Sequence, residues 1–333
     1  MPERSEHRGD ADLSANGSTK AVLAAMFANG GIAIAKFVGF AITGASSLLS
    51  EAIHSVADTG NQALLLLGGR RARRAASEEH PFGYARERYF WSFVVAVVLF
   101  TLGSLFAIYE GIHKMQHPEP INSPAVAFAI LGLGIVLEGW SFRTAVIESA
   151  ALKGESSWWS FLRNSKVPEL PVVLLEDAGA MVGLVAATCA ISVSIITDNG
   201  VWDGVGSVFI GLVLGVIAIF LCIEMKSLLI GESASSKVRE RLRGVIEADP
   251  RVARLIHDRT QHLGPDEVLV AVKVEFRQGL GVSELAAAVD DIEAAVRAEL
   301  PEVGPMYVEP DLYRSAEGPT AASGIGDRDP TSH

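Results

Sequence analysis

The sequence has 333 residues, of which 49% are hydrophobic and 20% charged, and its formal net charge is -11 at pH 7. This composition is too apolar for an ordinary soluble domain, and the acidic balance, concentrated in the C-terminal part, disfavours binding to nucleic acid. Both cysteines, Cys189 and Cys222, fall in apolar stretches, so no disulfide framework is predicted. We therefore expect a membrane protein with a polar, soluble end.

Six stretches are long enough, at about 20 residues per crossing, to be transmembrane helices embedded in a lipid bilayer. They cover residues 20–43, 47–69, 89–113, 124–147, 170–197 and 201–230. Lys and Arg gather in the N-terminal segment and in the second-to-third and fourth-to-fifth connections, whereas the other connections are nearly free of them. This bias predicts a multi-pass protein with both termini in the cytoplasm. The plasma membrane of a bacterium is the expected location, with an organelle membrane as the alternative.

The second stretch, SSLLSEAIHSVADTGNQALLLLGG, carries a stripe of polar residues in an otherwise apolar span. At about 100° per residue, these positions fall within one narrow arc of a helix. Ionisable groups at membrane depth are costly, face the protein interior and usually mark the path of an ion or proton. The stripe consists of Glu51, His54, Asp58, Asn61 and Gln62.

Two consecutive acids, Glu176 and Asp177, lie among apolar residues of the fifth stretch. Together with His54 and Asp58 they offer one nitrogen and three carboxylates, a ligand set that suits zinc and other divalent first-row metals. Neighbouring residues point about 100° apart on a helix, so both acids reach one ion only if the helix rotates locally or a side chain bends round. The sequence thus indicates a possible metal site between the second and fifth spans.

The alternative interpretation is that these acids only hold spans together, by pairing with other polar residues in the membrane. Asn29, Lys36 and Asn61 are the available partners. Two further intramembrane acids, Glu138 and Asp203, are candidates for supporting the central site or relaying protons.

The C-terminal part reads as a small α+β domain over residues 236–313, after a membrane domain over 19–231, with disordered segments at 1–18 and 314–333. Apolar spacing predicts helices at 236–248 and 283–299. Alternation of Val268, Val270, Val272, Val274 and Phe276 predicts a strand, with further extended segments at 252–263 and 306–309. The predicted order is αββαβ.

These motifs resemble the cation diffusion facilitators, secondary transporters that export zinc and related divalent ions in exchange for protons. The resemblance covers about residues 19–313 and rests on SLLSEAIHSVADTGNQ, HPFGYARERY, the acids of the fifth stretch, the DGVGS of Asp203–Ser207 and the αββαβ tail. The branch of zinc transporter nine looks most similar, in LLSEAIHS, in LLED and in Arg88, where other branches place Glu. The resemblance implies six transmembrane helices, a ferredoxin-like cytoplasmic domain, a homodimer and no enzymatic activity.

The resemblance also implies a transport site with two ligands from the second span, matching His54 and Asp58, and two from the fifth. One of the latter matches Asp177, but the position four residues earlier is Val173, which cannot bind metal. Glu176 is the substitute candidate for the fourth ligand, with a water molecule or Glu51 as alternatives.

Further metal sites are implied in the loop and in the tail. His80 of HPFGYARERY matches a place where some relatives bind zinc, although its neighbours equally indicate an ordered turn. His257, His262, Glu309 and Asp311 match positions where relatives hold regulatory metal between two tails. The alternative for these four is that they are exposed polar residues of strands.

The sequence therefore predicts export of a divalent cation, zinc in the first place, in exchange for protons, with the metal as substrate and not as a catalytic cofactor. A transporter that prefers Mn, Fe or Co and a membrane-anchored metal sensor are the alternatives. A metal-dependent hydrolase is disfavoured because no HExxH sequence is present.

Overall fold

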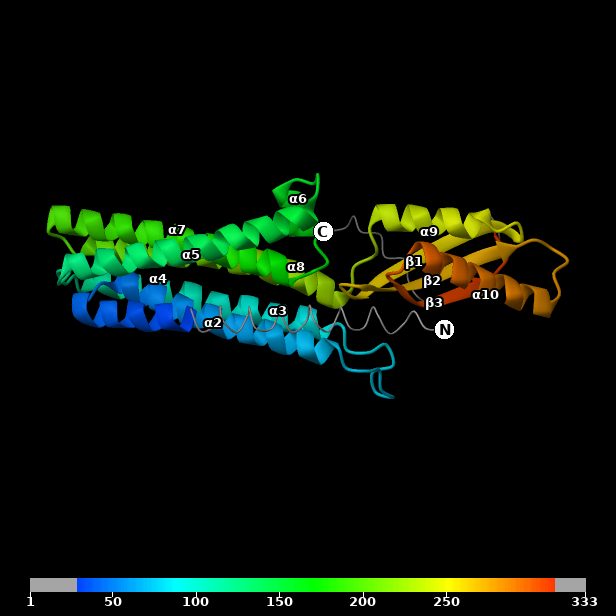
Figure 1. The fold of residues 1–333 in the computed structure, drawn as a ribbon, viewed down its shortest axis with the longest axis horizontal. Coiled ribbons are helices and arrows are strands. Elements are labelled where there is room, and N and C mark those ends of the chain that lie inside the picture. Colours follow the sequence, from blue (N-terminus) through cyan, green and yellow to red (C-terminus); the bar gives the residue numbers. More distant parts are fainter. Residues whose placement is uncertain (1–28, 315–333) are drawn as a thin grey trace, which may run out of the picture. The chain divides into compact units, whose positions relative to one another are not determined.

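The computed structural model describes residues 29–314 (Figure 1). The predictions for residues 1–18, for the start of the first span and for 315–333 lie outside this range. The chain divides into two compact units. The helical unit extends to Glu232 and also includes His262–Asp266, and the C-terminal unit comprises Ser233–Gln261 and the residues from Glu267 onward.

The helical unit is built from long helices, and Figure 1 shows α2 beside α3 and α5 beside α7. A first helix, Asn29–Thr43, precedes them. The others are α2 (Ser46–Ala72), α3 (Glu87–Val98), the π-helix η1 (Leu99–Leu105), α4 (Phe106–Gln116), α5 (Pro124–Lys153), α6 (Trp158–Asn164), α7 (Glu169–Thr197) and α8 (Val201–Ile230).

Four helices among the described residues are long and apolar enough to cross a membrane: Glu87–Gln116, Pro124–Ala150, Glu169–Thr197 and Val201–Ile230. The protein is therefore a multi-pass membrane protein. The predicted second span is α2, which has 27 residues but is less apolar because of its polar stripe. Asn29–Thr43, the described part of the predicted first span, is a shorter apolar helix.

Outward-facing side chains of this unit are large and apolar. Val216 of α8 and Trp140 of α5 are 70% and 74% exposed, and Leu133 and Phe209 are exposed as well. A surface of this kind suits contact with lipid chains. Inside, Leu48 of α2 packs in one core with side chains of α3, α7 and α8.

Helices α4 and α8 approach each other through glycines. A Cβ atom on Gly111 would lie 2.6 Å from the carbonyl oxygen of Gly204, and one on Gly211 would lie 2.8 Å from the carbonyl oxygen of Ser104. Small residues allow such close backbone contact between membrane helices. The glycines of α8 therefore fix its position against the third span.

The third predicted span is one continuous helical segment whose middle, η1, is a π-helix. The short helix α6, in the connection between the fourth and fifth spans, is also not predicted by the sequence. Its first turn is capped by Ser157, whose side chain accepts a hydrogen bond from the backbone N–H of Ser160.

The C-terminal unit has the predicted order of elements. They are α9 (Ser236–Ala248), β1 (Val252–Gly264), β2 (Glu267–Phe276), α10 (Val282–Glu299) and β3 (Val303–Pro310). The sheet has the order β1-β2-β3, and β2 pairs in parallel with β3. Alternate residues of β2, from Val268 to Val274, are buried in one core with Leu242 of α9 and Ile292 of α10.

Candidate functional site

Four of the five residues in the polar stripe of α2 are buried inside the helical unit, and the fifth, Gln62, is half-buried. Glu51, His54 and Asn61 have no exposed surface, and Asp58 is 8% exposed. Spacings of three and four residues place these side chains on one face of the helix, whereas Val56 on another face is 46% exposed. The predicted stripe is therefore confirmed as a buried polar face.

Several polar atoms of this face have no hydrogen-bond partner within the described part of the chain. They include both ring nitrogens of His54, Oδ1 of Asp58 and Oε1 of Glu51. His54 Nδ1 lies 3.5 Å from Asp58 Oδ1, which is longer than an ordinary hydrogen bond. Buried polar atoms without partners are rare and call for an explanation. A nitrogen and a carboxylate oxygen in this state fit the donor set of a divalent cation.

The two acids of α7 face different helices. Glu176 is buried and accepts a hydrogen bond of 2.6 Å from Asn61 Nδ2 of α2. Asp177 accepts a hydrogen bond of 2.9 Å from Ser141 Oγ of α5. This divergence is what the 100° separation of consecutive helical residues predicts. Both acids interact electrostatically with Asp58.

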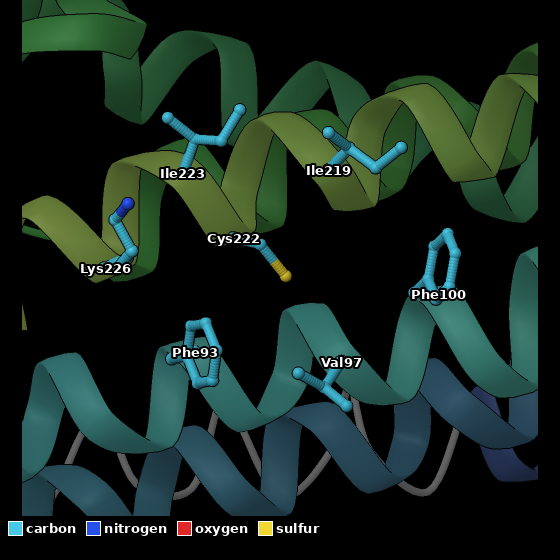
Figure 2. A pocket seen from close by; sticks show the side chains of 7 residues that line it. All are labelled: Phe93, Val97, Phe100, Ile219, Cys222, Ile223 and Lys226. Atoms are coloured by element: carbon cyan, nitrogen blue, oxygen red, sulfur yellow. The ribbon is translucent and has the colours of Figure 1, made fainter.

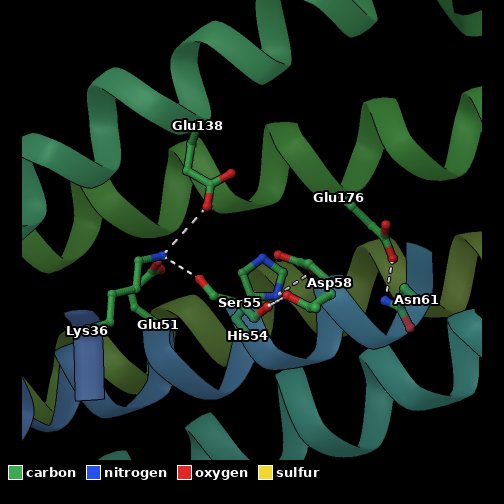
Figure 3. Close-up of polar contacts among 9 residues, drawn as sticks. Lys36, Glu51, His54, Ser55, Asp58, Asn61, Glu138 and Glu176 are labelled. Carbon is green, nitrogen blue, oxygen red and sulfur yellow. Dashed lines mark hydrogen bonds and ion pairs between the residues drawn. The ribbon is translucent and has the colours of Figure 1, made fainter. Parts of the chain in front are cut away.

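Within residues 29–314, no three His, Cys, Asp or Glu side chains converge closely enough to hold a metal ion. The structure therefore brings the four predicted ligands into one polar region but not to a common point. His54 and Asp58 are neighbours on α2, and Glu176 is turned toward that helix (Figure 3).

A buried lysine completes this region. Lys36 Nζ donates hydrogen bonds of 3.0 Å to Glu51 Oε2 and 2.8 Å to Ser55 Oγ, and it lies 3.8 Å from Glu138 Oε1 (Figure 3). The pairing that the alternative interpretation predicted is observed for one of the proposed ligands, Glu176, which bonds to Asn61, whereas the acids beside Lys36 are Glu51 and Glu138. A lysine within an apolar helix is the feature of the sequence that indicates this buried charge. Its partners could not be predicted because they lie 15 or more residues away in the sequence.

Asp203 supports the start of α2. Its Oδ2 accepts a hydrogen bond of 2.6 Å from the backbone N–H of Ser46, and its Oδ1 accepts one from the hydroxyl of Ser47. A carboxylate at this place satisfies free N–H groups and interacts favourably with the helix dipole. Asp203 therefore anchors the N-terminal end of the helix that carries His54 and Asp58, and a direct part in the central site or in proton relay stays a prediction.

His80 lies in an exposed, ordered turn. Its backbone N–H donates to the carbonyl oxygen of Ser77, and its ring packs against Tyr84 with 4.5 Å between ring centroids. The predicted turn before the third span is confirmed, and a metal at His80 stays a prediction.

The four candidate residues of the tail are spread over the sheet. His257 is exposed on β1, whereas Glu309 lies on β3, and the sheet order places β2 between them, which separates the two strands by about 10 Å. His262 is buried, with Nδ1 3.3 Å from the carbonyl oxygen of Gly264. A site that includes all four within one chain is not formed.

The two acids of the tail already have a cation between them. Lys273 of β2 lies 3.0 Å from both Glu309 and Asp311. The hydrogen bond from the lysine holds the pKa of Asp311 below its usual value. A metal at Asp311 would therefore have to displace the ammonium of Lys273.

A separate groove lies between α3 and α8 (Figure 2). Its volume is about 320 Å³, and its lining is Phe93, Val97, Phe100, Ile219, Cys222, Ile223 and Lys226. Because the lining contains no carboxylate and no imidazole, the groove does not offer the donor set of the α2 face.

Comparison with known proteins gives several matches. The family model of the cation efflux transmembrane domain matches residues 22–230. The "Proton-coupled zinc antiporter SLC30A9, mitochondrial" of Mus musculus is 35% identical over 264 residues, which are 78% of this chain and 46% of that protein. "Metal tolerance protein C4" of Arabidopsis thaliana is 29% identical over 261 residues, covering 78% of this chain and 57% of that protein.

The chain spans about half the length of these curated relatives. Among solved structures, the C-terminal domain of MamM in a nickel form matches with 18% identity and a TM-score of 0.23, covering 24% of this chain and 100% of that one.

Proposed function

Because this chain belongs to the cation diffusion facilitator family, a family of transporters and not of enzymes, we propose that it exports a divalent metal cation, zinc in the first place, in exchange for protons. The observation that carries the proposal is the buried face of α2, where His54 and Asp58 present ring nitrogens and a carboxylate oxygen that have no hydrogen-bond partner among residues 29–314. The names of two relatives, a zinc antiporter and a metal tolerance protein, support the same substrate class.

The proposed ligands are His54 and Asp58 of α2 with Asp177 and Glu176 of α7. Asn61 directs Glu176 toward α2, so that Glu176 is the proposed fourth ligand in place of the missing one at Val173. Asp177 would leave Ser141 and turn toward the ion when it binds. One nitrogen with oxygen donors suits zinc in tetrahedral geometry.

Exchange with protons follows from the chemistry of these ligands. A metal binds neutral histidine and ionised carboxylates, so metal and protons compete for the same atoms. In a state open to the cytoplasm the ion displaces protons, and in a state open to the other side protons displace the ion. Returning protons limit the net charge that the helices have to move through the membrane.

We also propose the arrangement that the sequence predicts. The helix containing Asn29–Thr43 and α2 cross the membrane with the four more apolar spans, giving six, and both termini lie in the cytoplasm. The C-terminal unit is then a ferredoxin-like cytoplasmic domain, two copies of which form a homodimer that binds regulatory metal at His257, His262, Glu309 or Asp311. The expected bacterial plasma membrane has no support from the comparisons, since the antiporter relative is named as mitochondrial.

The test is zinc movement into proteoliposomes under an imposed pH gradient. We expect loss of transport in Asp58→Asn and Asp177→Asn, whereas Asp198→Asn, a matched change at an exposed helix end, leaves it intact. Two further variants test the identity of the fourth ligand. We expect Glu176→Ala to lose zinc transport and Val173→His to retain it.

Zinc movement that ignores the pH gradient, or that survives both substitutions of Asp58 and Asp177, overturns the exchange mechanism. Faster movement of manganese, iron or cobalt than of zinc would favour the alternative transporter. Metal binding by the tail without any flux would favour a membrane-anchored sensor.

A further inference from the structure

Lys36 is held deep in the helical unit by oxygen atoms from two other helices. Its side chain is 1% exposed, and its ammonium contacts Glu51 and Ser55 of α2 and lies 3.8 Å from Glu138 of α5. Glu51 lies one turn before His54 on the same face of α2. The ammonium thus sits beside the proposed transport site (Figure 3).

Two carboxylates and a hydroxyl are also the donors that a divalent cation takes from oxygen-rich sites. The two carboxyl groups of Glu51 and Glu138 face the single ammonium of Lys36, and a buried charge needs compensation. Oε1 of Glu51 is fully buried, and no residue between 29 and 314 forms a hydrogen bond with it. It lies against Gly183 of α7, where a Cβ atom would come within 2.2 Å of it. The glycine leaves room for this carboxylate and confines it next to Lys36.

We propose that Glu51, Glu138 and Ser55 form a second cation-binding site, which the ammonium of Lys36 occupies as a tethered cation. While Lys36 is in place, a second metal ion is excluded. An incoming ion is directed to His54 and Asp58, and this last step rests on the proposed function. Lys36 also removes Glu51 from the transport ligands, because its Oε2 is engaged by the ammonium.

The first test counts metal ions in the full-length protein, purified in detergent, by equilibrium dialysis against zinc and elemental analysis. Lys36→Met keeps an unbranched side chain of similar length and removes the charge. We expect Lys36→Met to bind one more zinc ion per protomer than the native protein. The additional ion should be absent from the triple variant Lys36→Met, Glu51→Gln, Glu138→Gln. An unchanged zinc count in well-folded Lys36→Met, or an additional ion that persists in the triple variant, overturns the proposal.

A second measurement does not require the single variant Lys36→Met to fold, because it uses only the double and the triple variant. In the double variant Glu51→Gln, Glu138→Gln the ammonium loses its counter-charges and remains beside the transport site, where it repels a metal ion. We expect zinc affinity to fall by at least about tenfold, and the triple variant to recover most of it. Native affinity in the double variant, or no recovery in the triple variant, contradicts the tethered-cation role, since a purely structural ion pair would not be rescued by removing its lysine.

Failure of the transport site can be told apart from failure of this proposal. The zinc count of Asp58→Asn alone tests whether the first ion binds at the transport site. The zinc count of Asp58→Asn combined with Lys36→Met tests whether the second ion binds at the site that Lys36 occupies. If Asp58→Asn keeps the first ion, the proposed ligands are wrong, and the zinc count of Lys36→Met still decides the role of Lys36.

Discussion

The side-chain amide of Asn61 on α2 donates a hydrogen bond of 2.6 Å to the carboxylate of Glu176 on α7. Asn61 lies three residues beyond Asp58, so this bond joins the two ligand-bearing helices about one turn from the proposed site. Glu176 is thereby turned toward α2, while its neighbour Asp177 is held by Ser141 of α5.

Asn61 should therefore matter for metal binding without being a ligand itself. We expect Asn61→Ala to lower zinc affinity by about 10–100-fold, the usual effect of losing a group that orients a ligand. Titration of the purified protein with zinc against a competing chelator measures this. Asn122→Ala, at an exposed position, should leave the affinity unchanged. If Asn61→Ala binds zinc like the native protein, the orienting role is wrong.

His54 should destabilise the metal-free protein, because both of its ring nitrogens are buried and have no hydrogen-bond partner in the part of the chain that the structure describes. His54→Leu replaces these atoms by an apolar group, and we expect a gain of about 1–3 kcal/mol in stability together with loss of transport. Thermal unfolding in detergent without metal, and zinc flux in proteoliposomes, measure the two effects. Zinc should raise the unfolding temperature of the native protein and not that of the variant. A less stable variant would show that the imidazole has a partner in the folded protein.

The close contact between α4 and α8 should tolerate no side chain at Gly111. Its Cβ would meet backbone atoms of Gly204 and Val208 at 2.6 and 2.7 Å, and overpacking of this kind costs about 1–3 kcal/mol or more. We expect Gly111→Val to lower the thermal stability in detergent. The matched control is Gly132→Ala on α5, where nothing lies within 4 Å of an added Cβ. This control should be neutral or slightly stabilising, and equal losses in both variants would argue against the contact.

The C-terminal unit should show one identifiable acid-sensitive pair. Hydrogen bonds from the side chain of Arg251 lower the pKa of Asp249 below its ordinary value of 3.8, and Arg251 also bonds to Asp291 of α10. A lowered pKa in the folded state contributes stability that is complete above the unfolded value and is lost as the pH falls through the folded value.

We therefore expect protection of β1 from hydrogen exchange, corrected for intrinsic rates, to fall in the native protein as the pH is lowered below about 4. The fall should be smaller in Asp249→Asn, which is less protected than the native protein above pH 4. Asp290→Asn, the same change at the neighbouring acid of α10, serves as the matched control and should follow the native profile. Identical profiles for all three proteins would contradict the prediction.

Elements whose information is local could be predicted from the sequence. The apolar spacing of Leu242 and Ile246 predicts α9 with the bounds observed, and the alternating valines from Val268 predict β2. The π-helix η1 was not predicted because its residues continue the apolar pattern of the helices on both sides. The turn of α6 was missed because it is too short for a periodic pattern to show.

For the candidate site, the sequence identified the residues but not their partners. Burial of Glu51, His54 and Asp58 follows from the cost of charge in a membrane. That Lys36 binds Glu51 and Glu138, or that Asp177 turns to Ser141, depends on how separate helices face each other. Which faces of two helices contact each other depends on packing across the whole unit, so a local sequence pattern does not predict it.

The cap that Asp203 forms on α2 restricts which helices can move when the proposed site opens to one side of the membrane or the other. His54 follows Ser46 by eight residues, about 12 Å along the helix axis, with no loop between the cap and the ligand. Asp203 belongs to α8, which touches the backbone of α4 at Gly111. The three helices therefore form a frame in which α2 cannot slide lengthwise on its own. If the chain transports as proposed, we expect His54 and Asp58 to move with this frame, and the displacement that exposes the ion to one side or the other to occur between the frame and the helices that bring Lys36 and Glu138 to it.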